Sequence, residues 1–157
     1  MPVAALREPP VLLASGFGAG LAPVAPGTAG SLVGVLIYIP MADLPIPLYL
    51  AVVLVLAIAG VWLCDRAGRR LGVTDHPGIV WDEIVGLLIA LTGSPWSWQG
   101  TLLGFVLFRL FDILKPWPIG RIDRGVAGGL GVMLDDVVAG LYALASLQIL
   151  RNAFGIP

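Results

Sequence analysis

The chain alternates long apolar runs with short segments that hold most of its charged and turn-forming residues. The apolar runs cover residues 32–41, 46–64, 84–91, 101–114 and 137–150. The second run is close to the roughly 20 residues that a membrane-spanning helix needs, whereas the first is shorter and follows a segment rich in glycine and proline. The pattern predicts an all-α protein with four to five hydrophobic helices and no separate soluble domain.

The fourth run ends in a stretch, residues 108–118, in which three charged residues follow one another at helical spacing. Arg109, Asp112 and Lys115 stand at i, i+3 and i+6, so a helix places them along one stripe. Pro116 ends that helix, because proline lacks an N–H group and disfavours the α conformation of the residue before it. We therefore expect the end of an apolar helix to bring two cations and a carboxylate to one place.

Residues 16–31 are dense in glycine and proline, and we expect a loop or broken segment there. Thr28 or Ser31 is a suitable N-cap for the apolar run that follows. Two interpretations stay open: the start of a helix interrupted by Pro26, or a glycine-rich turn around Gly27 whose N–H groups bind an anion at a helix N-terminus. The segment is not a P-loop, because no lysine follows the glycines.

Composition indicates a membrane protein. Of the 157 residues, 58% are hydrophobic and 12% are charged, and the mean hydropathy is +0.95. A water-soluble domain of this size needs more polar surface, so we predict an integral membrane helical bundle that forms a single membrane-embedded domain over residues 1–157. The net charge of −1 argues against nucleic acid as a partner. A single cysteine, Cys64, allows neither an internal disulfide nor a cysteine metal cluster.

The basic residues fall on one side if each apolar run crosses the membrane once. That side receives Arg7, the cluster Arg66, Arg69 and Arg70, and the cluster Lys115, Arg121 and Arg124. The opposite loops, around Asp43 and Trp96, contain no lysine or arginine. By the positive-inside rule the basic side faces the cytoplasm. We therefore predict a multi-pass protein whose polar motif loops lie on the cytoplasmic side, among them a polar, glycine-rich loop that contains Arg121, Asp123, Arg124 and residues 125–131.

Two pairs of acids open apolar runs on that side, Asp82 with Glu83 and Asp135 with Asp136. Favourable interaction with the helix macrodipole is one explanation for acids at a helix start. Apolar residues flank both pairs, however, and Asp112 also lies in an apolar helix end; carboxylates in such surroundings are costly near a membrane and indicate function. Five carboxylates suit Mg²⁺, which takes oxygen ligands. Together with the two nearby cations, they suit phosphoryl chemistry.

Other chemistries lack their residues in this sequence. Cys64 is followed by Asp65 and Arg66 rather than by the loop of a cysteine phosphatase, and no Asp-x-Asp-x-Thr pattern offers a phosphoaspartyl route. His76 is the sole histidine, which argues against mechanisms that need two. A small membrane transporter remains an alternative, but its charges are expected mid-helix and facing a pore rather than gathered at one interface.

Four motifs, in order along nearly the whole chain, carry a resemblance to a known family. They are residues 16–31, residues 75–86 (DHPGIVWDEIVG), residues 108–118 and residues 128–140 (GGLGVMLDDVVAG). With these motifs the sequence resembles the phosphatidylglycerophosphatase A family. The resemblance implies a bacterial enzyme of the cytoplasmic (inner) membrane that depends on Mg²⁺ and removes the terminal phosphate of phosphatidylglycerophosphate, giving phosphatidylglycerol and phosphate.

The resemblance also implies residues of the site. The family's acidic motif positions correspond to Asp75, Asp82, Glu83, Asp112, Asp135 and Asp136, with Thr28, Arg109 and Lys115 beside them. Ala127 stands where some members have a polar residue, so the resemblance gives that position no catalytic role here.

These inferences combine into one hypothesis for the site. Asp82, Glu83, Asp112 and Asp136 hold one or two Mg²⁺ ions, Arg109 and Lys115 bind the phosphate oxygens, and the segment around Thr28 supplies N–H groups. Asp135 is either a further ligand or the base, and Asp75, Gly27 and Ser31 form a second tier. Water attack and direct carboxylate attack both stay open. Another lipid phosphomonoester as the substrate, the number of crossings and homo-oligomerisation stay open as well.

Overall fold

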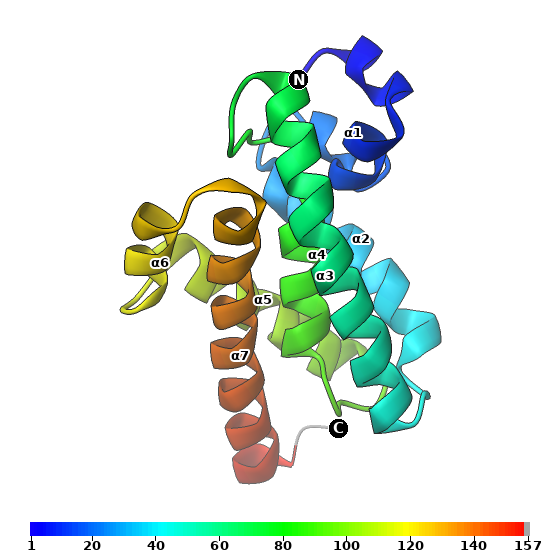
Figure 1. Ribbon diagram of the computed structural model, residues 1–157. Helices are drawn as coiled ribbons and strands as arrows, with labels where there is room; N and C mark the ends of the chain where they lie inside the picture. Colours follow the sequence, from blue (N-terminus) through cyan, green and yellow to red (C-terminus); the bar gives the residue numbers. More distant parts are fainter. Residues whose placement is uncertain (156–157) are drawn as a thin grey trace.

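A computed structural model describes residues 1–155 of the chain (Figure 1). Every regular element in this range is helical. In chain order the elements are η1 (Val3–Arg7), α1 (Pro9–Ala14), η2 (Ala19–Leu21), α2 (Pro26–Met41), α3 (Ile46–Leu71), α4 (Trp81–Ala90), α5 (Trp98–Leu114), α6 (Ile119–Gly125) and α7 (Gly128–Phe154), where η marks a 3₁₀ helix. The predicted all-α class is confirmed.

The ends of α3 and α5 follow from residues with special backbone preferences. A proline in the first turn starts α3, and Gly72 ends it in the left-handed conformation with φ 74°. Ser97 starts α5, because its Oγ accepts a hydrogen bond from the N–H of Gly100 at 3.1 Å. α5 ends at Leu114, just before Pro116, as the sequence predicts.

α2 begins earlier than the apolar run that predicts it. Its first residue is Pro26, whose fixed φ suits the first position of a helix. Neither Thr28 nor Ser31 is the N-cap, which corrects our expectation. Ala25 occupies that position without a side-chain cap, and the Ser31 Oγ donates to the Gly27 carbonyl at 2.9 Å. The broken segment is therefore confined to residues before α2.

α7 also begins earlier than predicted. It starts at Gly128, so Asp135 and Asp136 lie two turns inside the helix instead of at its N-terminus. The helix macrodipole acts on charges in the first turn and does not account for this pair. Close contact with α3 explains Gly129, because a Cβ there would collide with the Val61 carbonyl. The glycine-rich stretch, predicted as a loop, is a helix–helix contact.

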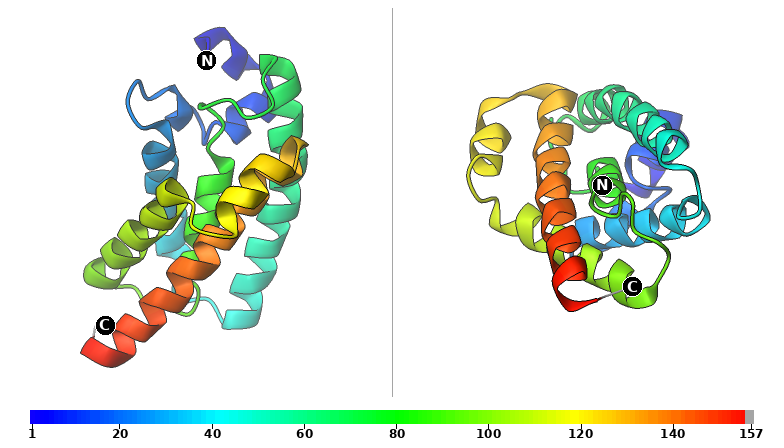
Figure 2. Two further views of the ribbon diagram at one scale, coloured as in Figure 1. Left: turned by 90° about the vertical axis from the view of Figure 1, so that its left-hand side faces the viewer. Right: turned by 90° about the horizontal axis from the view of Figure 1, so that it is seen from below.

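α4 is the centre of the bundle. Ile84, Val85, Leu87 and Leu88 are fully buried. α4 packs against α2, α3, α5 and α7, and the view from below shows it surrounded by these helices (Figure 2, right). Because α4 is only 10 residues long, the acids in its first turn lie within the bundle and not on a projecting loop.

The outward faces of the surrounding helices are apolar. Large hydrophobic side chains are exposed on α2, α3, α5 and α7, among them Leu32, Leu36, Ile39, Leu48, Leu50, Leu54, Val55, Ile58, Leu102, Val106, Leu110, Leu141 and Ile149. Two helices, α3 and α7, are long and apolar enough to cross a membrane by length and composition. These surfaces support a membrane location, while the number of four to five membrane helices stays a prediction.

The polar motifs gather at one end of the bundle. The first turn of α4, the end of α5, α6 and the first half of α7 meet there, on the side of α6 in Figure 1. The loop between α3 and α4 belongs to the same end. Segments that are far apart in the sequence therefore form one polar region, and the functional site lies in it.

Candidate active site

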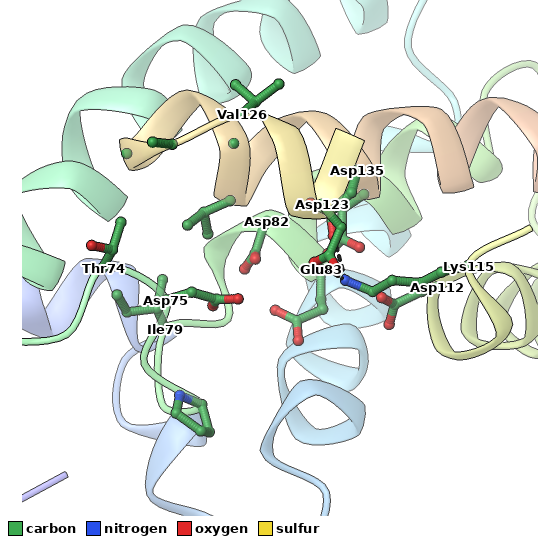
Figure 3. A pocket seen from close by; sticks show the side chains of 16 residues that line it. Thr74, Asp75, Ile79, Asp82, Glu83, Asp112, Lys115, Asp123, Val126 and Asp135 are labelled. Atoms are coloured by element: carbon green, nitrogen blue, oxygen red, sulfur yellow. Dashed lines mark hydrogen bonds and ion pairs between the residues drawn. The ribbon is translucent and has the colours of Figure 1, made fainter. Parts of the chain in front are cut away.

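A cavity of about 350 Å³ opens between these segments (Figure 3). The loop before α4, the first turn of α4, the end of α5, α6 and the first half of α7 line it. Its charged and hydroxyl side chains are Thr74, Asp75, Asp82, Glu83, Asp112, Lys115, Asp123, Asp135 and Asp136. Apart from Thr74 and Asp123, all of these are predicted site residues, and the fold brings them together.

Three carboxylates form a compact acidic group in the cavity. Asp82, Glu83 and Asp136 each present an oxygen atom, and these oxygens all lie within 4.8 Å of one another. Asp82 and Asp136 are only 8% and 3% exposed. Within the described residues, Asp82 Oδ1 and Glu83 Oε2 are buried and have no hydrogen-bond partner. Because like charges this close repel each other, the group fits a hard divalent cation, whose preferred ligands are oxygens.

Burial changes the acidity of the acids at the start of α4, which lies outside the two helices long enough to cross a membrane. Removal from water raises the pKa of Asp82 well above its usual value, and the Glu83 and Asp136 carboxylates raise it further. Burial also raises the pKa of Glu83, although Arg109 acts in the opposite direction. The surroundings thus disfavour both charged carboxylates, and a bound cation would favour them again.

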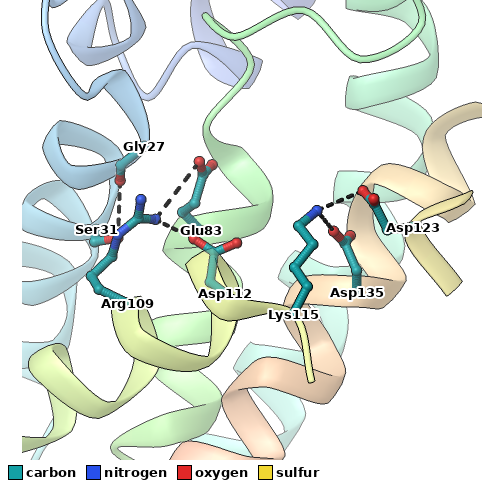
Figure 4. Close-up of polar contacts among 8 residues, drawn as sticks. All are labelled: Gly27, Ser31, Glu83, Arg109, Asp112, Lys115, Asp123 and Asp135. Atoms are coloured by element: carbon teal, nitrogen blue, oxygen red, sulfur yellow. Dashed lines mark hydrogen bonds and ion pairs between the residues drawn. The ribbon is translucent and has the colours of Figure 1, made fainter. Parts of the chain in front are cut away.

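Arg109 offsets the acidic charge from behind the cavity wall. Its Nη1 lies 2.5 Å from Asp112 Oδ2 and 4.0 Å from Glu83 Oε1 (Figure 4). The side chain is 15% exposed and is not among the described residues that line the cavity. Gly27 of α2 makes room for it, because a Cβ there would collide with Glu83 and the guanidinium. Asp112 lines the cavity outside the group of three carboxylates and is paired with Arg109.

Lys115 links α5, α6 and α7. Its Nζ donates to Asp123 Oδ1 at 2.5 Å and to Asp135 Oδ2 at 2.7 Å (Figure 4). Burial disfavours the ammonium, but the bonds to the two carboxylates outweigh burial, so the pKa of Lys115 is raised. Lys115 is the C-cap of α5 with φ 43° and therefore leaves the predicted stripe with Arg109 and Asp112. Turn geometry, rather than helical spacing, brings the lysine to the cavity.

Asp123 and Thr74 are polar cavity residues that the sequence analysis does not predict. Asp123 is eight positions from Lys115, and the intervening chain contains two prolines and the start of α6, so no periodic pattern relates the two. A weak signal exists, because Asp123 is the acid between Arg121 and Arg124 in a stretch otherwise interpreted as a polar loop. Thr74 lies in the loop after α3 without a distinguishing motif.

The glycine-rich segment lies beside the acids rather than in the cavity wall. Thr28, Ser31 and Gly27 are not among the described residues that line the cavity. The Thr28 N–H donates to the Ala25 carbonyl at 3.0 Å, and Ser31 is buried. Asp75, the second-tier residue that belongs to the motif of residues 75–86, does line the cavity. The visible contribution of the segment is the close approach of Gly27 to Glu83.

Fold and site together define a class: a helical protein with apolar outer faces and, at one end, a cavity that holds a compact carboxylate group and a lysine. The sequence profile described as Phosphatidylglycerophosphatase A matches residues 12–151. The chain belongs to this family, and the matched residues include the whole lining of the cavity. The resemblance predicted from the motifs is confirmed.

Curated relatives support the same assignment. The chain is 45% identical to the phosphatidylglycerophosphatase A of Escherichia coli strain K12, over 94% of this chain and 86% of the relative. It is 45% identical to the Haemophilus influenzae protein of the same name, over 88% of this chain and 86% of the relative. A Bacteroides thetaiotaomicron protein, provisionally named phosphatidylinositol-3-phosphatase, is 38% identical over 93% of this chain and 96% of the relative. No solved structure matches the chain significantly.

Proposed function

We propose that this protein hydrolyses the terminal phosphomonoester of phosphatidylglycerophosphate to phosphatidylglycerol and phosphate, with Mg²⁺ as its cofactor. One observation carries the proposal: the buried carboxylate group beside Lys115 lies in the part of the chain that matches the family. Relatives that are 45% identical over most of the chain are named for this activity.

The acids of the cavity would repel an anionic substrate unless cations offset them. Asp82, Glu83 and Asp136 would hold the Mg²⁺, because their oxygens are close together and two of these side chains have a buried oxygen without a hydrogen-bond partner among the described residues. When bound, Mg²⁺ supplies positive charge that stabilises the negative charge of the phosphoryl oxygens. Asp112 lines the same cavity and, in this proposal, completes the acidic wall.

Lys115 and Arg109 have different tasks in this proposal. Lys115 lines the cavity, and its ammonium binds the phosphate oxygens as a point charge. Arg109 holds Asp112 and Glu83 in position; the direct phosphate contact expected from the sequence would require its guanidinium to turn away from Asp112.

Two carboxylates lie beside the bound phosphate in this arrangement, because Asp123 Oδ1 is 2.5 Å and Asp135 Oδ2 is 2.7 Å from the Lys115 Nζ, and Asp135 is the one that adjoins Asp136 of the acidic group. We assign Asp135 the role of general base, which accepts a proton from the attacking water. The water oxygen bonds to phosphorus as the bond between phosphorus and the glycerol oxygen breaks; the glycerol oxygen takes a proton from solvent, and Asp135 returns its proton to solvent. Attack by a carboxylate instead of water would leave a phosphorylated side chain, which mass spectrometry of the quenched enzyme would detect.

The protein acts from within the membrane in this proposal. In it α3 and α7 cross the bilayer and α2 and α5 lie in it as well; the length of α3 and α7 and the exposed apolar side chains on all four helices support this arrangement. By the positive-inside rule the cavity faces the cytoplasm from the bacterial inner membrane. Only the headgroup enters the cavity, because the acyl chains stay in the bilayer.

Phosphate release by the purified protein in detergent tests the proposal. With phosphatidylglycerophosphate as the substrate, we expect release with Mg²⁺ and none with EDTA. Asp82→Asn keeps the shape of the side chain but removes its charge, so turnover should fall about 100-fold or more while the helical circular dichroism is retained. Asp43→Asn, in the turn between α2 and α3, is the matched control and should stay active. Full activity of Asp82→Asn would exclude the carboxylate group as the site.

Another lipid phosphomonoester is the second candidate substrate. The Bacteroides relative, 38% identical, carries a provisional name for a different lipid phosphate. Comparing kcat/KM for phosphatidylglycerophosphate, phosphatidic acid and phosphatidylinositol 3-phosphate decides between them. A transporter is disfavoured, because the acids and cations of the site gather at one end of the described bundle rather than along a path through it.

A further inference from the structure

A second hollow, separate from the acidic cavity, lies where the N-terminal segment meets the C-terminal end of α3. Its volume is about 400 Å³, and three arginines line it, Arg7, Arg66 and Arg70, together with Glu8, Trp62 and two prolines. None of these residues lines the acidic cavity. Figure 1 shows α1 beside the upper part of α3, against which it packs. This hollow is termed the arginine groove.

The arginine groove is positively charged. Glu8 Oε2 lies 2.9 Å from the Nε of Arg70, whereas neither Arg7 nor Arg66 forms an ion pair among the described residues. Three arginines and one glutamate leave a charge of +3 − 1, or two net positive charges. The ligand that suits such a groove is an anion.

Trp62 places the groove at the level of lipid headgroups. Its side chain is 54% exposed, and the Arg66 Cζ lies 5.9 Å from the centroid of its ring system. Trp62 stands at the end of the apolar outer face of α3, and the charged residues of the helix begin at Asp65. Tryptophan at such a transition is typical of the membrane–water interface, so the arginines beside it reach the phosphate layer.

The favourable interaction of basic residues with the end of a helix explains only some of the arginines in and beside the groove. Basic residues in the last turn of a helix interact favourably with the macrodipole, which covers Arg69 and Arg70. Arg66 lies about one turn earlier, and Arg7 comes from η1, a separate element. The positive-inside rule accounts for the sign of the charges but not for the convergence of two chain segments on one hollow.

We propose that the arginine groove binds the phosphodiester of an anionic phospholipid at the membrane surface, in addition to the substrate in the acidic cavity. Such a lipid offers a phosphate to Arg7 and Arg66, contact at the interface to Trp62, and acyl chains that lie along the apolar face of α3. Free phosphate could contact Arg7 and Arg66 but not Trp62 or the apolar face of α3. The inference requires the protein to lie in a membrane but does not depend on its substrate.

Native mass spectrometry of the full-length protein in detergent tests the groove. The protein is mixed with equal, limiting amounts of phosphatidylglycerol and phosphatidylcholine, and the retained lipids are counted. Each arginine near an anionic lipid adds about five-fold in affinity, so we expect wild type to prefer phosphatidylglycerol by about ten-fold or more. The double variant Arg7→Gln/Arg66→Gln should lose this preference, and both arginines are exposed, so the fold should be unaffected.

Two control variants distinguish lipid binding in the groove from a general effect of positive charge and from binding in the acidic cavity. Arg69→Gln removes one positive charge from α3, the helix of Arg66, but outside the groove, and should keep the preference. Lys115→Gln alters the acidic cavity and should keep it too. Displacement of the lipid by millimolar inorganic phosphate would identify a free-phosphate site and overturn the lipid assignment. A preference that persists in the double variant, or disappears in Lys115→Gln, would overturn the groove itself.

Discussion

Lys115 joins three helices through one ammonium group. It caps α5, bonds to Asp123 on α6 and to Asp135 on α7, and lines the acidic cavity. Two carboxylates compensate its charge before any substrate arrives. A phosphate group that enters the cavity therefore competes with Asp123 or Asp135 for the same ammonium.

Replacing Lys115 by a neutral side chain should weaken substrate binding. Lys115→Gln removes the charge that faces the phosphate, and a hydrogen bond to a charged group is worth about 1.5–3 kcal/mol, so we expect KM to rise about ten-fold or more. Steady-state phosphate release over a range of lipid concentrations measures this change. Lys115→Arg keeps the charge and should recover part of the loss. An unchanged KM in Lys115→Gln would show that the phosphate binds elsewhere.

The raised pKa of Lys115 fixes the pH range in which its bonds stabilise the fold. A group with a raised pKa contributes fully below its unfolded value, 10.5 for this lysine, and the contribution is lost as the pH rises through the folded value. The difference in Tm between wild type and Lys115→Gln should thus stay constant from about pH 7.5 to about pH 9. Thermal melts at several pH values measure it, and a difference that shrinks within this range would contradict the raised pKa.

The acids of the site can be predicted one by one from the sequence, but their partners cannot. Asp82 and Asp136 stand out because apolar residues surround them. Asp123 lies where charges are common, and its contact with Lys115 depends on the left-handed backbone at the end of α5, which no residue spacing encodes. The contact between Arg109 and Asp112 does follow from helical spacing, although the position of Arg109 behind the cavity wall depends on the tertiary fold.

At the scale of the element, glycines set the distances between the helices that carry the acids. A Cβ on Gly140 of α7 would collide with the Gly86 carbonyl of α4, and one on Gly86 would meet the Phe108 ring and the Asp136 carbonyl. Gly27 permits a similar approach of α2 to Glu83. The side chains at these contacts, including the acids of α4 and α7, are thereby brought close together.

Gly27→Ala should reduce activity although it suits a helix. Alanine is favoured over glycine within a helix by about 1 kcal/mol, but its Cβ would displace the Glu83 carboxylate and the Arg109 guanidinium. Misplacement by about 1 Å can cost about 100-fold in rate, so we expect a loss of that order in phosphate release. Gly125→Ala is the control, because a Cβ there meets nothing within 4 Å. Wild-type activity of Gly27→Ala would show that catalysis tolerates movement of Glu83.

The apolar runs predict the positions of α3, α4 and α5, because these helices bury or expose apolar side chains along most of their length. The starts of α2 and α7 are different. Both lie in glycine-rich stretches that local composition identifies as loops, whereas in the fold Gly27 and Gly129 allow these helices to approach their neighbours closely. α6, a short helix in a polar segment, has no apolar run to reveal it.

At the scale of the whole molecule, polar chemistry and apolar surface occupy separate regions. The acidic cavity and the arginine groove involve residues at the C-terminal ends of α3 and α5 and the N-terminal parts of α4 and α7. The outward faces of α2, α3, α5 and α7 are apolar. This division supports a membrane location, and in the proposed arrangement the polar end lies at the cytoplasmic interface.

Two single substitutions test that orientation. Gln99→Cys lies in the first turn of α5 and Arg121→Cys on α6, both at exposed positions, while the native Cys64 is fully buried. A membrane-impermeant maleimide added to spheroplasts should label Gln99→Cys at once and Arg121→Cys only after permeabilisation. Wild type is the control for labelling of Cys64. The reverse pattern would place the acidic cavity on the outer side of the membrane.

The split origin of the acidic group has a consequence for biogenesis. Asp82 and Glu83 come from the middle of the chain, whereas Asp135 and Asp136 come from α7, the last helix described. A nascent chain that has formed its helices only as far as α5 thus carries two acids of the group without the third, and Lys115 without either of its two partners. The chain must therefore add α7 before the site is complete, so in the proposed function a half-made chain cannot hydrolyse lipid phosphates.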